Sequence, residues 1–210
     1  MGKIEITKKV LGICATNCYT VVDTETKEAL IIDPADRADV LIRDWKDKGV
    51  TPQAVLLTHG HFDHIGALAG VKKEYPDIKV YAAAEEKEVM ESPALNLSSS
   101  FGAAFTAQAD IYLEDGAEIE VLGRKCKCLL VPGHTKGGMC YYFPEENVVF
   151  TGDTLFCYSV GRTDFPTGDA KALEEAIREK LFTLPDETLV LPGHDAQTMI
   201  EKEKKGNPYF

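Results

Sequence analysis

Four side chains that can bind a metal ion fall within six consecutive residues, His59-Gly60-His61-Phe62-Asp63-His64. Imidazole and carboxylate groups are common ligands of zinc, iron and manganese. The segment directly follows an apolar run, residues 54–57, which predicts a buried strand that ends beside the first ligand. Side chains alternate between the two faces of a strand, so the chain must turn here for all four ligands to converge, and Gly60 makes a turn easy. The segment therefore predicts a metal site at the end of a sheet.

Three more candidate ligands stand in a similar setting. Two other apolar runs are each followed by Pro-Gly-His, which places His134 and His194 directly after predicted strands. A third apolar run leads through Thr-Gly to Asp153. A single histidine in such a place is often a hydrogen-bonded structural residue. Because all five histidines of the chain follow apolar runs, with glycine in each turn, we interpret them together with Asp63 and Asp153 as one set of metal ligands.

The chemistry of this set favours two ions. A structural zinc site normally has four ligands, is rich in cysteine and is closed to solvent. Seven nitrogen and oxygen ligands without a cysteine fit two divalent ions and leave room for water. We expect zinc, with iron or manganese as alternatives, since imidazole and carboxylate ligands suit all three. The six cysteines form no standard four-ligand zinc pattern and are expected to be reduced thiols.

Two strand-rich halves have to position these ligands. Short runs rich in β-branched and apolar residues predict strands, and helical spacing of apolar residues predicts helices. The predicted strands span residues 3–10, 17–22, 29–32, 54–57, 80–82, 128–131, 139–143, 148–150 and 189–191. The predicted helices span residues 38–48, 65–75, 84–90, 170–179 and 195–205. No linker divides the chain, so we expect a single domain, residues 1–210, built from two packed sheets flanked by helices.

Residues 92–108 differ from the rest of the chain. They include Pro93, three consecutive serines and Gly102, and they show no clear period. Long irregular segments of this kind are often functional. We interpret this one either as a surface segment beside the entrance of the site or as a mobile connection.

Composition disfavours several kinds of partner. The chain has 23 Lys and Arg against 34 Asp and Glu, a net charge of −11, whereas nucleic-acid binding needs a basic face. It contains no run of about 18 apolar residues that could cross a membrane. Its first residues lack the apolar stretch of a signal peptide. We therefore expect a cytoplasmic protein that binds neither nucleic acid nor membranes.

In its ligand pattern the chain resembles the metallo-β-lactamase superfamily. The resemblance implies an α+β fold, a four-layer αββα sandwich with the site at one edge of the two sheets. It also implies how the ligands are divided. The first ion would be bound by His59, His61 and His134, and the second by Asp63, His64 and His194. Asp153 would bridge both ions. The best-known β-lactamases carry cysteine in place of this bridging aspartate, so β-lactam hydrolysis is not the expected activity.

Within the superfamily the chain is most similar to the glyoxalase II group of hydroxyacylglutathione hydrolases, in particular to their short bacterial members. The residues that carry this likeness are Pro132-Gly133-His134-Thr135, Thr151-Gly152-Asp153-Thr154-Leu155-Phe156 and Gly161-Arg162-Thr163-Asp164-Phe165. The likeness implies hydrolysis of a small-molecule thioester such as S-lactoylglutathione. Classical members have a C-terminal helical domain that supplies much of the glutathione-binding surface, whereas sixteen residues follow His194 here. A different thiol or a broader range of thioesters is therefore an alternative.

The family also has a basic substrate contact in the segment that matches Gly161-Arg162. Arg162 is therefore a candidate for binding a substrate carboxylate, because its planar guanidinium group suits one. The alternative is a structural ion pair with Asp164 or another acid.

The expected mechanism uses a metal-bridging hydroxide. A bound divalent cation lowers the pKa of water from 15.7 to about 7, so no serine or cysteine nucleophile is required. Asp63 and Asp153 are the candidate catalytic carboxylates, and Asp153 would orient the ions and accept the remaining proton. Asp33 and Asp195 could hold ligand imidazoles from behind, or they could be turn or helix-cap residues.

Three alternatives use the same residues. Persulfide dioxygenases also carry a Gly-Arg-Thr-Asp-Phe segment after the bridging aspartate, and they use one iron ion. Lactonases and phosphodiesterases share the fold. A metal-binding module without activity is the third alternative, but a closed, inert site would not need seven ligands.

Overall fold

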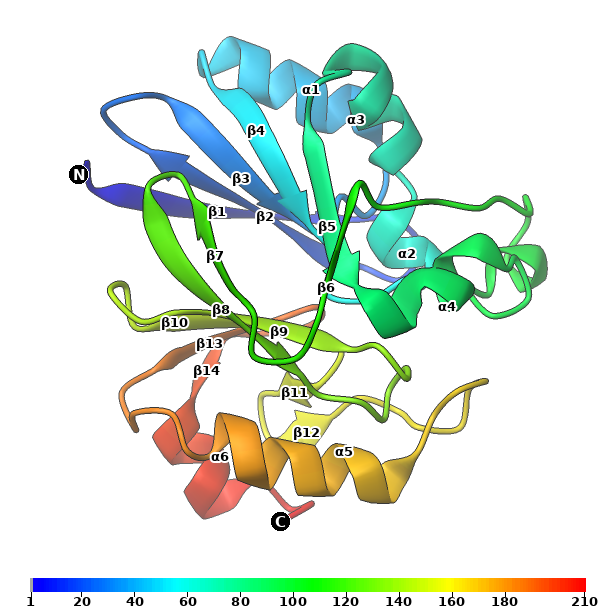
Figure 1. Cartoon of the computed structure of the whole chain (residues 1–210), viewed down its shortest axis with the longest axis vertical. Helices are drawn as coiled ribbons and strands as arrows, with labels where there is room; N and C mark the ends of the chain where they lie inside the picture. Colours follow the sequence, from blue (N-terminus) through cyan, green and yellow to red (C-terminus); the bar gives the residue numbers. More distant parts are fainter. Residues whose placement is uncertain (1) are drawn as a thin grey trace.

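Two six-stranded sheets face each other at the centre of the molecule (Figure 1). The computed structural model describes residues 2–210. In the first sheet the strands lie in sequence order, antiparallel from β1 to β3 and parallel from β3 to β6. They are β1 (Ile4–Leu11), β2 (Thr16–Asp23), β3 (Glu28–Ile32), β4 (Thr51–Leu56), β5 (Lys79–Ala83) and β6 (Ile111–Leu113).

The second sheet has the order β14-β13-β10-β9-β8-β7. Its pairs are antiparallel except β10 with β13, which run parallel. The strands are β7 (Glu118–Val121), β8 (Arg124–Leu130), β9 (Met139–Phe143), β10 (Val148–Gly152), β13 (Leu189–Pro192) and β14 (Thr198–Met199). A small separate hairpin is formed by β11 (Leu155–Phe156) and β12 (Ser159–Val160).

Helices cover the outer face of each sheet, so the molecule has four layers (Figure 1). The first sheet is covered by α1 (Ala38–Asp47) and α3 (Leu68–Glu74), and the second by α5 (Ala170–Ala176), a π-helical turn η3 (Ile177–Leu181) and α6 (Ile200–Gly206). Short helical turns at one edge of the sandwich are α2 (Phe62–Ile65), η1 (Ala84–Glu86), α4 (Lys87–Glu91) and η2 (Ser98–Ser100). This arrangement confirms the predicted αββα sandwich.

Strand β3 shows how the sequence produces these layers. Leu30 and Ile32 belong to the core between the two sheets. Ala29 and Ile31, on the opposite face of the strand, pack in the core that includes Trp45 of α1. A strand with an apolar layer on each face has to be apolar throughout, and all four of these residues are at most 1% exposed.

Two predicted helices differ from the structure. The predicted helix 65–75 is divided into α2 and α3, because the Ala67 N–H donates to the carbonyl of Pro34 at 2.9 Å instead of continuing one helix. The predicted helix 195–205 begins only at Ile200, because the two residues before it form β14 and pair with β13. Five further strands, β6, β7, β11, β12 and β14, were not predicted, because each has only two to four residues and is too short to show a period.

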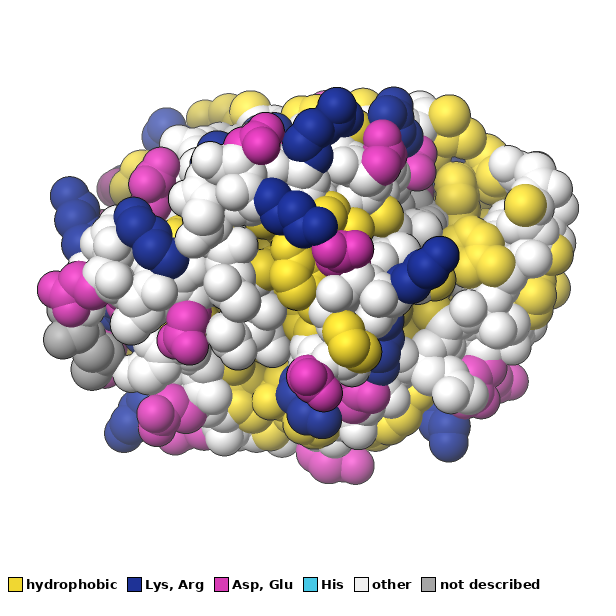
Figure 2. Space-filling model, turned by 90° about the horizontal axis from the view of Figure 1, so that it is seen from above, with side chains coloured by type: hydrophobic (Ala, Val, Ile, Leu, Met, Phe, Trp, Pro, Cys, Tyr) yellow, Lys and Arg dark blue, Asp and Glu magenta, His cyan; other side chains and the backbone are white. Residues whose placement is uncertain are grey.

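Surface charge is mixed on the face that carries α1 and α3. Lys and Arg side chains alternate there with Asp and Glu rather than gathering in a basic stripe (Figure 2). Within residues 2–210, the helices are all too short or too polar to cross a membrane.

Candidate metal centre

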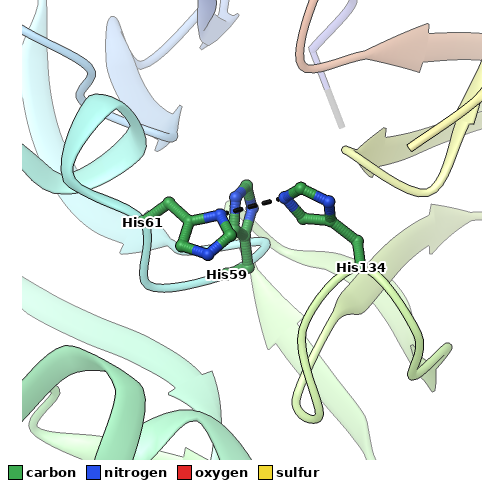
Figure 3. A group of neighbouring side chains, drawn as sticks. All are labelled: His59, His61 and His134. Carbon is green, nitrogen blue, oxygen red and sulfur yellow. Dashed lines mark hydrogen bonds between the residues drawn. The ribbon is translucent and has the colours of Figure 1, made fainter. Parts of the chain in front are cut away.

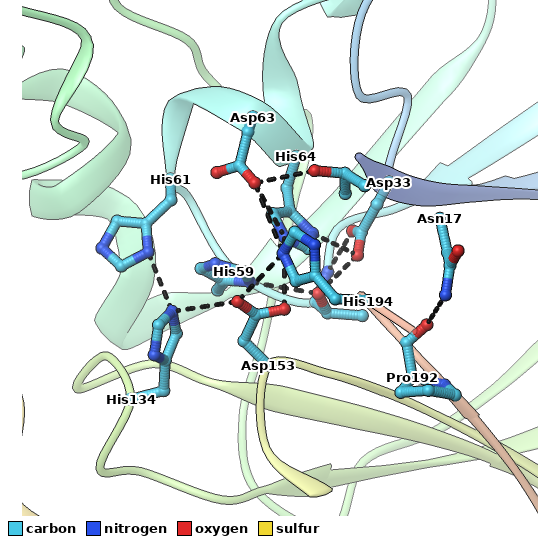
Figure 4. A network of polar contacts seen from close by, with 12 residues as sticks. Asn17, Asp33, His59, His61, Asp63, His64, His134, Asp153, Pro192 and His194 are labelled. Atoms are coloured by element: carbon cyan, nitrogen blue, oxygen red, sulfur yellow. Dashed lines mark hydrogen bonds and ion pairs between the residues drawn. The ribbon is translucent and has the colours of Figure 1, made fainter. Parts of the chain in front are cut away.

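The seven candidate ligands meet at one edge of the sandwich (Figure 4). They come from the segment after β4, from α2, and from the turns that follow β8, β10 and β13. Their ligand atoms form three overlapping groups in which all atoms lie within 4.8 Å of one another. These groups are His59/His61/His134, His59/His64/Asp153 and Asp63/His64/His194.

The first group consists of three buried histidines (Figure 3). His61 Nδ1 lies 2.9 Å from His134 Nε2. The ring of His59 stands edge-on to both other rings, with centroids 4.8 Å away. These three residues are the ones expected to bind one ion.

The group Asp63/His64/His194, called the second group from here on, brings together residues from α2 and from the turn after β13. Asp63 Oδ2 is 3.6 Å from His64 Nε2 and 3.5 Å from His194 Nε2. The Nε2 atoms of the two histidines are 3.4 Å apart. These are the three residues expected to bind the other ion.

Asp153 lies between the two groups. Its Oδ1 is 3.3 Å from His64 Nε2, and its Oδ2 is 3.5 Å from His134 Nε2 and 3.3 Å from His194 Nε2. One carboxylate therefore reaches both sets of histidines, as the bridging position requires.

Hydrogen bonds on the outer side of the rings orient three of the histidines. His64 Nδ1 donates to Asp33 Oδ2 at 2.8 Å, and His134 Nδ1 donates to the backbone carbonyl of Arg162 at 2.7 Å. His59 Nδ1 is 3.2 Å from Thr58 Oγ1, which itself donates to Asp33 at 2.6 Å. In the neutral ring, a hydrogen held on Nδ1 leaves Nε2 with a lone pair that faces the centre, the usual arrangement of histidine ligands.

These contacts decide between the two roles considered for Asp33 and Asp195. Asp33 is placed as the first role requires, because its carboxylate accepts from the imidazole of the candidate ligand His64. The prediction of the same role is wrong for Asp195, whose side chain is exposed and has no hydrogen bond within residues 2–210. Its backbone carbonyl accepts bonds from Asn17 and Lys8 instead. It is not a helix cap either, since α6 starts five residues later.

Three acceptor atoms at the centre lack a hydrogen-bond donor within residues 2–210. His59 Nε2, His61 Nε2 and Asp153 Oδ1 are buried without a hydrogen-bond partner among the described residues. Buried polar atoms are normally satisfied, and clusters of lone pairs and carboxylates repel one another. A divalent cation removes both problems, so the residues present fit a metal site.

The two groups differ in protonation. Burial lowers the pKa of His59 and His134, and it lowers the pKa of His61 to about 3, so these rings are neutral. Burial also acts on His64 and His194, but the neighbouring carboxylates outweigh it and raise the pKa of His64 well above its usual value and that of His194 to about 9. The first group is therefore ready to bind a cation, whereas the second has to lose protons.

Glu86 is a residue of this site that the sequence analysis missed. It is fully buried; Oε1 accepts from Gly60 N–H at 2.8 Å and Oε2 accepts from the Thr135 hydroxyl at 2.9 Å. The backbone of Gly137 donates to it as well, and burial raises its pKa to about 7. The carboxylate thus ties the turn between two ligands of the first group to the turn that carries the third.

Strand β2 plays a similar part for the second group. The Thr16 hydroxyl donates to Asp63 Oδ2 at 2.7 Å. Asn17 donates from its side chain to the Pro192 carbonyl at 2.9 Å and from its backbone to Gly193 at 2.7 Å. Nothing in the sequence distinguishes these residues from other polar residues of an ordinary strand.

A cavity of about 430 Å³ opens over the centre, and Arg162 lines it. The guanidinium group of Arg162 makes two hydrogen bonds of 2.7 Å with Asp164, and its Cζ lies 3.9 Å from the ring centroid of Phe165. The ion pair considered as the alternative for Arg162 is therefore present. All six cysteines are free thiols, and Cys14 also lines the cavity.

Comparison with known proteins places this centre in a family. Residues 11–194 match the family model of the metallo-beta-lactamase superfamily. The probable metallo-hydrolase YqgX of Bacillus subtilis is 38% identical over 202 residues, covering 95% of this chain and 94% of that protein. The hydroxyacylglutathione hydrolase GloC of Haemophilus influenzae is 35% identical over 200 residues, covering 92% of each.

Solved structures agree with these relatives. The B3 metallo-beta-lactamase BLEG-1 has a TM-score of 0.92 and 38% identity, covering 98% of this chain and 99% of that one. A di-iron-bound form of TTHA1623 has a TM-score of 0.85 and 36% identity, covering 97% and 100%. ETHE1 from Myxococcus xanthus has a TM-score of 0.81 and 31% identity, covering 97% and 83%. The convergent histidine and aspartate cluster, the αββα fold and these matches together show that the chain belongs to the metallo-β-lactamase superfamily, with a site for divalent metal.

Proposed function

We propose that this protein is a binuclear metal-dependent hydrolase that cleaves the thioester bond of a small molecule such as S-lactoylglutathione. The observation that carries the proposal is the position of Asp153, whose two oxygens reach His64 at 3.3 Å and His134 at 3.5 Å. A carboxylate shared between two groups of three ligands suits two neighbouring ions. The likeness to a relative described as a hydroxyacylglutathione hydrolase supports the substrate class.

Each group would hold one ion. His59, His61 and His134 would bind the first, while Asp63, His64 and His194 would bind the second. Zinc is our first choice, and the di-iron-bound form of TTHA1623 supports iron as an alternative to it. Manganese also suits nitrogen and oxygen ligands.

Divalent ions bound here would supply Lewis acidity and an ionised water near neutral pH. The chain itself has to hold the ligands, orient the substrate and accept a proton. Asp63 and Asp153 are the carboxylates that face the centre, and we assign proton acceptance to Asp153 because the Thr16 hydroxyl already bonds to Asp63.

A thioester suits a site without a protein nucleophile or a general acid. The leaving thiolate needs little proton assistance, because the pKa of an ordinary thiol is about 8.5. Cys14 lines the cavity, but burial and the nearby Asp63 raise the pKa of its thiol, so it stays protonated and is a poor nucleophile.

Arg162 is our candidate for contact with a substrate carboxylate. It is the arginine among the residues that line the cavity, so its charge persists at every pH of interest, and its side chain is 57% exposed. To bind a substrate anion it would exchange Asp164 for the ligand, which costs little because exposed ion pairs contribute about 0–1 kcal/mol.

A persulfide dioxygenase is the second candidate function. The specific observation in its favour is the 31% identity to ETHE1 together with the Gly-Arg-Thr-Asp-Phe segment at residues 161–165. This reaction would need one iron ion in the first group, so metal content separates it from the hydrolase.

The test combines metal analysis with activity. Protein loaded separately with zinc, iron and manganese is analysed for ions per chain and assayed with S-lactoylglutathione, glutathione persulfide, a lactone, a phosphodiester and a β-lactam. Two ions per chain and thioester hydrolysis that a chelator abolishes and added metal restores are expected. One iron ion per chain with oxygen uptake on the persulfide, and no thioester hydrolysis, would refute the proposal.

A further inference from the structure

The cavity over the centre has an aromatic wall beside the candidate ligands. Phe62 of α2 stacks on Phe101, with ring centroids 4.6 Å apart and planes inclined by 16°. Phe165 stands edge-on to the ring of His61 at 5.8 Å, and Phe156 to that of His194 at 6.0 Å. All four phenylalanines line the same cavity, so a bound molecule meets apolar surface as soon as it leaves the metal ligands.

Phe101 is the exposed member of this wall. It is 50% exposed and lies beside three other phenylalanines in the cavity, and an aromatic lining of this kind is typical of a small-molecule binding site. Residues 92–108, which carry it, lie at the end of the molecule where apolar side chains gather on the surface (right in Figures 1 and 2). The wall is therefore part of the site entrance.

Hydrogen bonds hold this segment against the ligand segment. The Phe62 N–H donates to the Asn96 carbonyl at 2.8 Å. The Asn96 side chain donates to the Phe105 carbonyl at 2.9 Å, and the Ser98 hydroxyl bonds to the same residue. Of the two interpretations of residues 92–108, these contacts favour an anchored surface at the site entrance over a mobile connection.

The charges of the cavity do not match a strongly anionic ligand. Arg162 is the cation among the lining residues, and it is paired with Asp164. Asp63, Asp153 and Asp195 line the same cavity. After two divalent ions are bound, one cationic side chain is available outside the centre, whereas the aromatic wall offers contact to a neutral apolar group.

We propose that Phe62 and Phe101 bind an apolar acyl group, so that the site prefers thioesters of apolar acids over the thioester of lactic acid. This inference rests on the proposed thioester hydrolysis and names the acyl class that the same site selects. The stacked pair is then the specificity-determining surface of the enzyme.

The test keeps the thiol constant and varies the acyl group. S-Acetyl-, S-butyryl- and S-hexanoylglutathione measure chain length, and S-isobutyrylglutathione is the apolar isostere of S-lactoylglutathione. Each kcat/KM is divided by the rate of alkaline hydrolysis of the same thioester to remove intrinsic reactivity. Full burial of one methylene should raise the normalised kcat/KM about fourfold. A half-open wall should therefore raise it about twofold per methylene, or about 15-fold from acetyl to hexanoyl.

Variants of Phe101 test whether the aromatic wall causes the preference for longer acyl groups. Phe101→Ala should reduce the hexanoyl-to-acetyl ratio to about fourfold or less, and Phe101→Leu should keep an intermediate ratio. Ile111→Ala is the matched control, because Ile111 is also exposed, at 37%, but lies on β6 and does not line the cavity. Circular dichroism and metal content of each variant verify that the fold and the centre are intact.

The outcomes separate this inference from the proposed function. Three results would overturn the inference without affecting the proposed hydrolase function. They are a kcat/KM that does not depend on acyl chain length, a preference for lactoyl over isobutyryl, and an unchanged hexanoyl-to-acetyl ratio in Phe101→Ala. No hydrolysis of any member of the series by metal-loaded protein, either as glutathione or as N-acetylcysteamine thioesters, would overturn the proposed function itself.

Discussion

Loading the metal-free protein with a divalent ion should release protons from one half of the centre and not from the other. The rings of His59, His61 and His134 have lowered pKa values because they are buried, so they carry no proton to displace near neutral pH. His64 and His194 have raised pKa values because carboxylates surround them. A metal ion binds the neutral imidazole, so it must displace these protons.

The size of the effect follows from these values. With a pKa of about 9 for His194 and a pKa well above 6.5 for His64, both rings are almost fully protonated at pH 7. The first ion should therefore release about zero protons and the second about two. In the variant His194→Gln, binding of the second ion should release about one proton. Affinity for the second ion should rise with pH, by about 100-fold per unit while two protons are displaced, and less steeply above pH 9.

The same shift predicts the stability of the metal-free protein. His194 has a folded pKa of about 9, above its usual 6.5, so its charged form is favoured by folding. The stabilisation is fully present below pH 6.5 and is lost as the pH rises through about 9. The shift corresponds to about 3 kcal/mol of the free energy of unfolding, an order-of-magnitude figure.

Calorimetric titration in buffers of different ionisation enthalpy measures the protons released by each ion, and urea unfolding at several pH values measures the stability. Arg162→Gln is the control, since that side chain is not a candidate ligand and should release the same number of protons as the unmodified chain. Two protons released by the first ion, or none by the second, would show that the assignment of neutral and protonated histidines is wrong.

Three further changes test separate parts of the structure. Asp63→Ala should remove one metal equivalent and lower kcat by about 100-fold or more, as loss of an electrostatic catalytic group does; two retained ions with full activity would contradict the ligand assignment. Glu86→Gln replaces one of the two carboxylate oxygens that accept from Gly60 and Thr135 by an amide NH₂, which cannot accept. Urea unfolding of the metal-free protein should therefore show a loss of about 1–3 kcal/mol in the free energy of unfolding, and unchanged stability would contradict the role of Glu86 in joining the two turns. Phe150→Ala removes a ring that is 1% exposed between the two sheets and leaves a cavity there. The free energy of unfolding should therefore fall by about 3–5 kcal/mol, while the metal content stays the same. A loss below about 1 kcal/mol would show that Phe150 does not contribute to the core.

The positions of the ligands could be predicted because the relevant signals are local. Each apolar run belongs to a sheet strand, and each ligand follows it within a few residues, so the local pattern of residues 129–134 or 189–194 is enough to predict where the ligand lies. The same holds for the αββα layers, since apolar strands and amphipathic helices leave few ways to bury all their apolar faces.

The supporting residues could not be predicted because their partners are distant in the chain. Glu86 bonds to residues 26 and 49 positions away, and Asn17 bonds to Pro192, which is 175 positions away. In sequence, Glu86 is one of several acidic residues in a short polar helix. Its role becomes visible only in the folded chain, where its carboxylate accepts hydrogen bonds from the two turns that contain Gly60 and Thr135. Strand β14 was missed for the same reason, since two residues become a strand only through their pairing with β13.

The repeated order of strand, glycine and ligand has a geometric cause. Strands β10 and β13 are neighbours and parallel, with Gly152 opposite Pro192, so their ends deliver Asp153 and His194 to the same edge. The Gly193 N–H donates to the Gly152 carbonyl at 2.8 Å, which locks the two turns together. A Cβ on Gly193 would lie 2.3 Å from Asp153 Oδ1, closer than any real contact. Glycine is therefore required at position 193 for Asp153 Oδ1 to lie 3.3 Å from His64 Nε2, so the bridging position of Asp153 depends on a residue that has no side chain to bind metal.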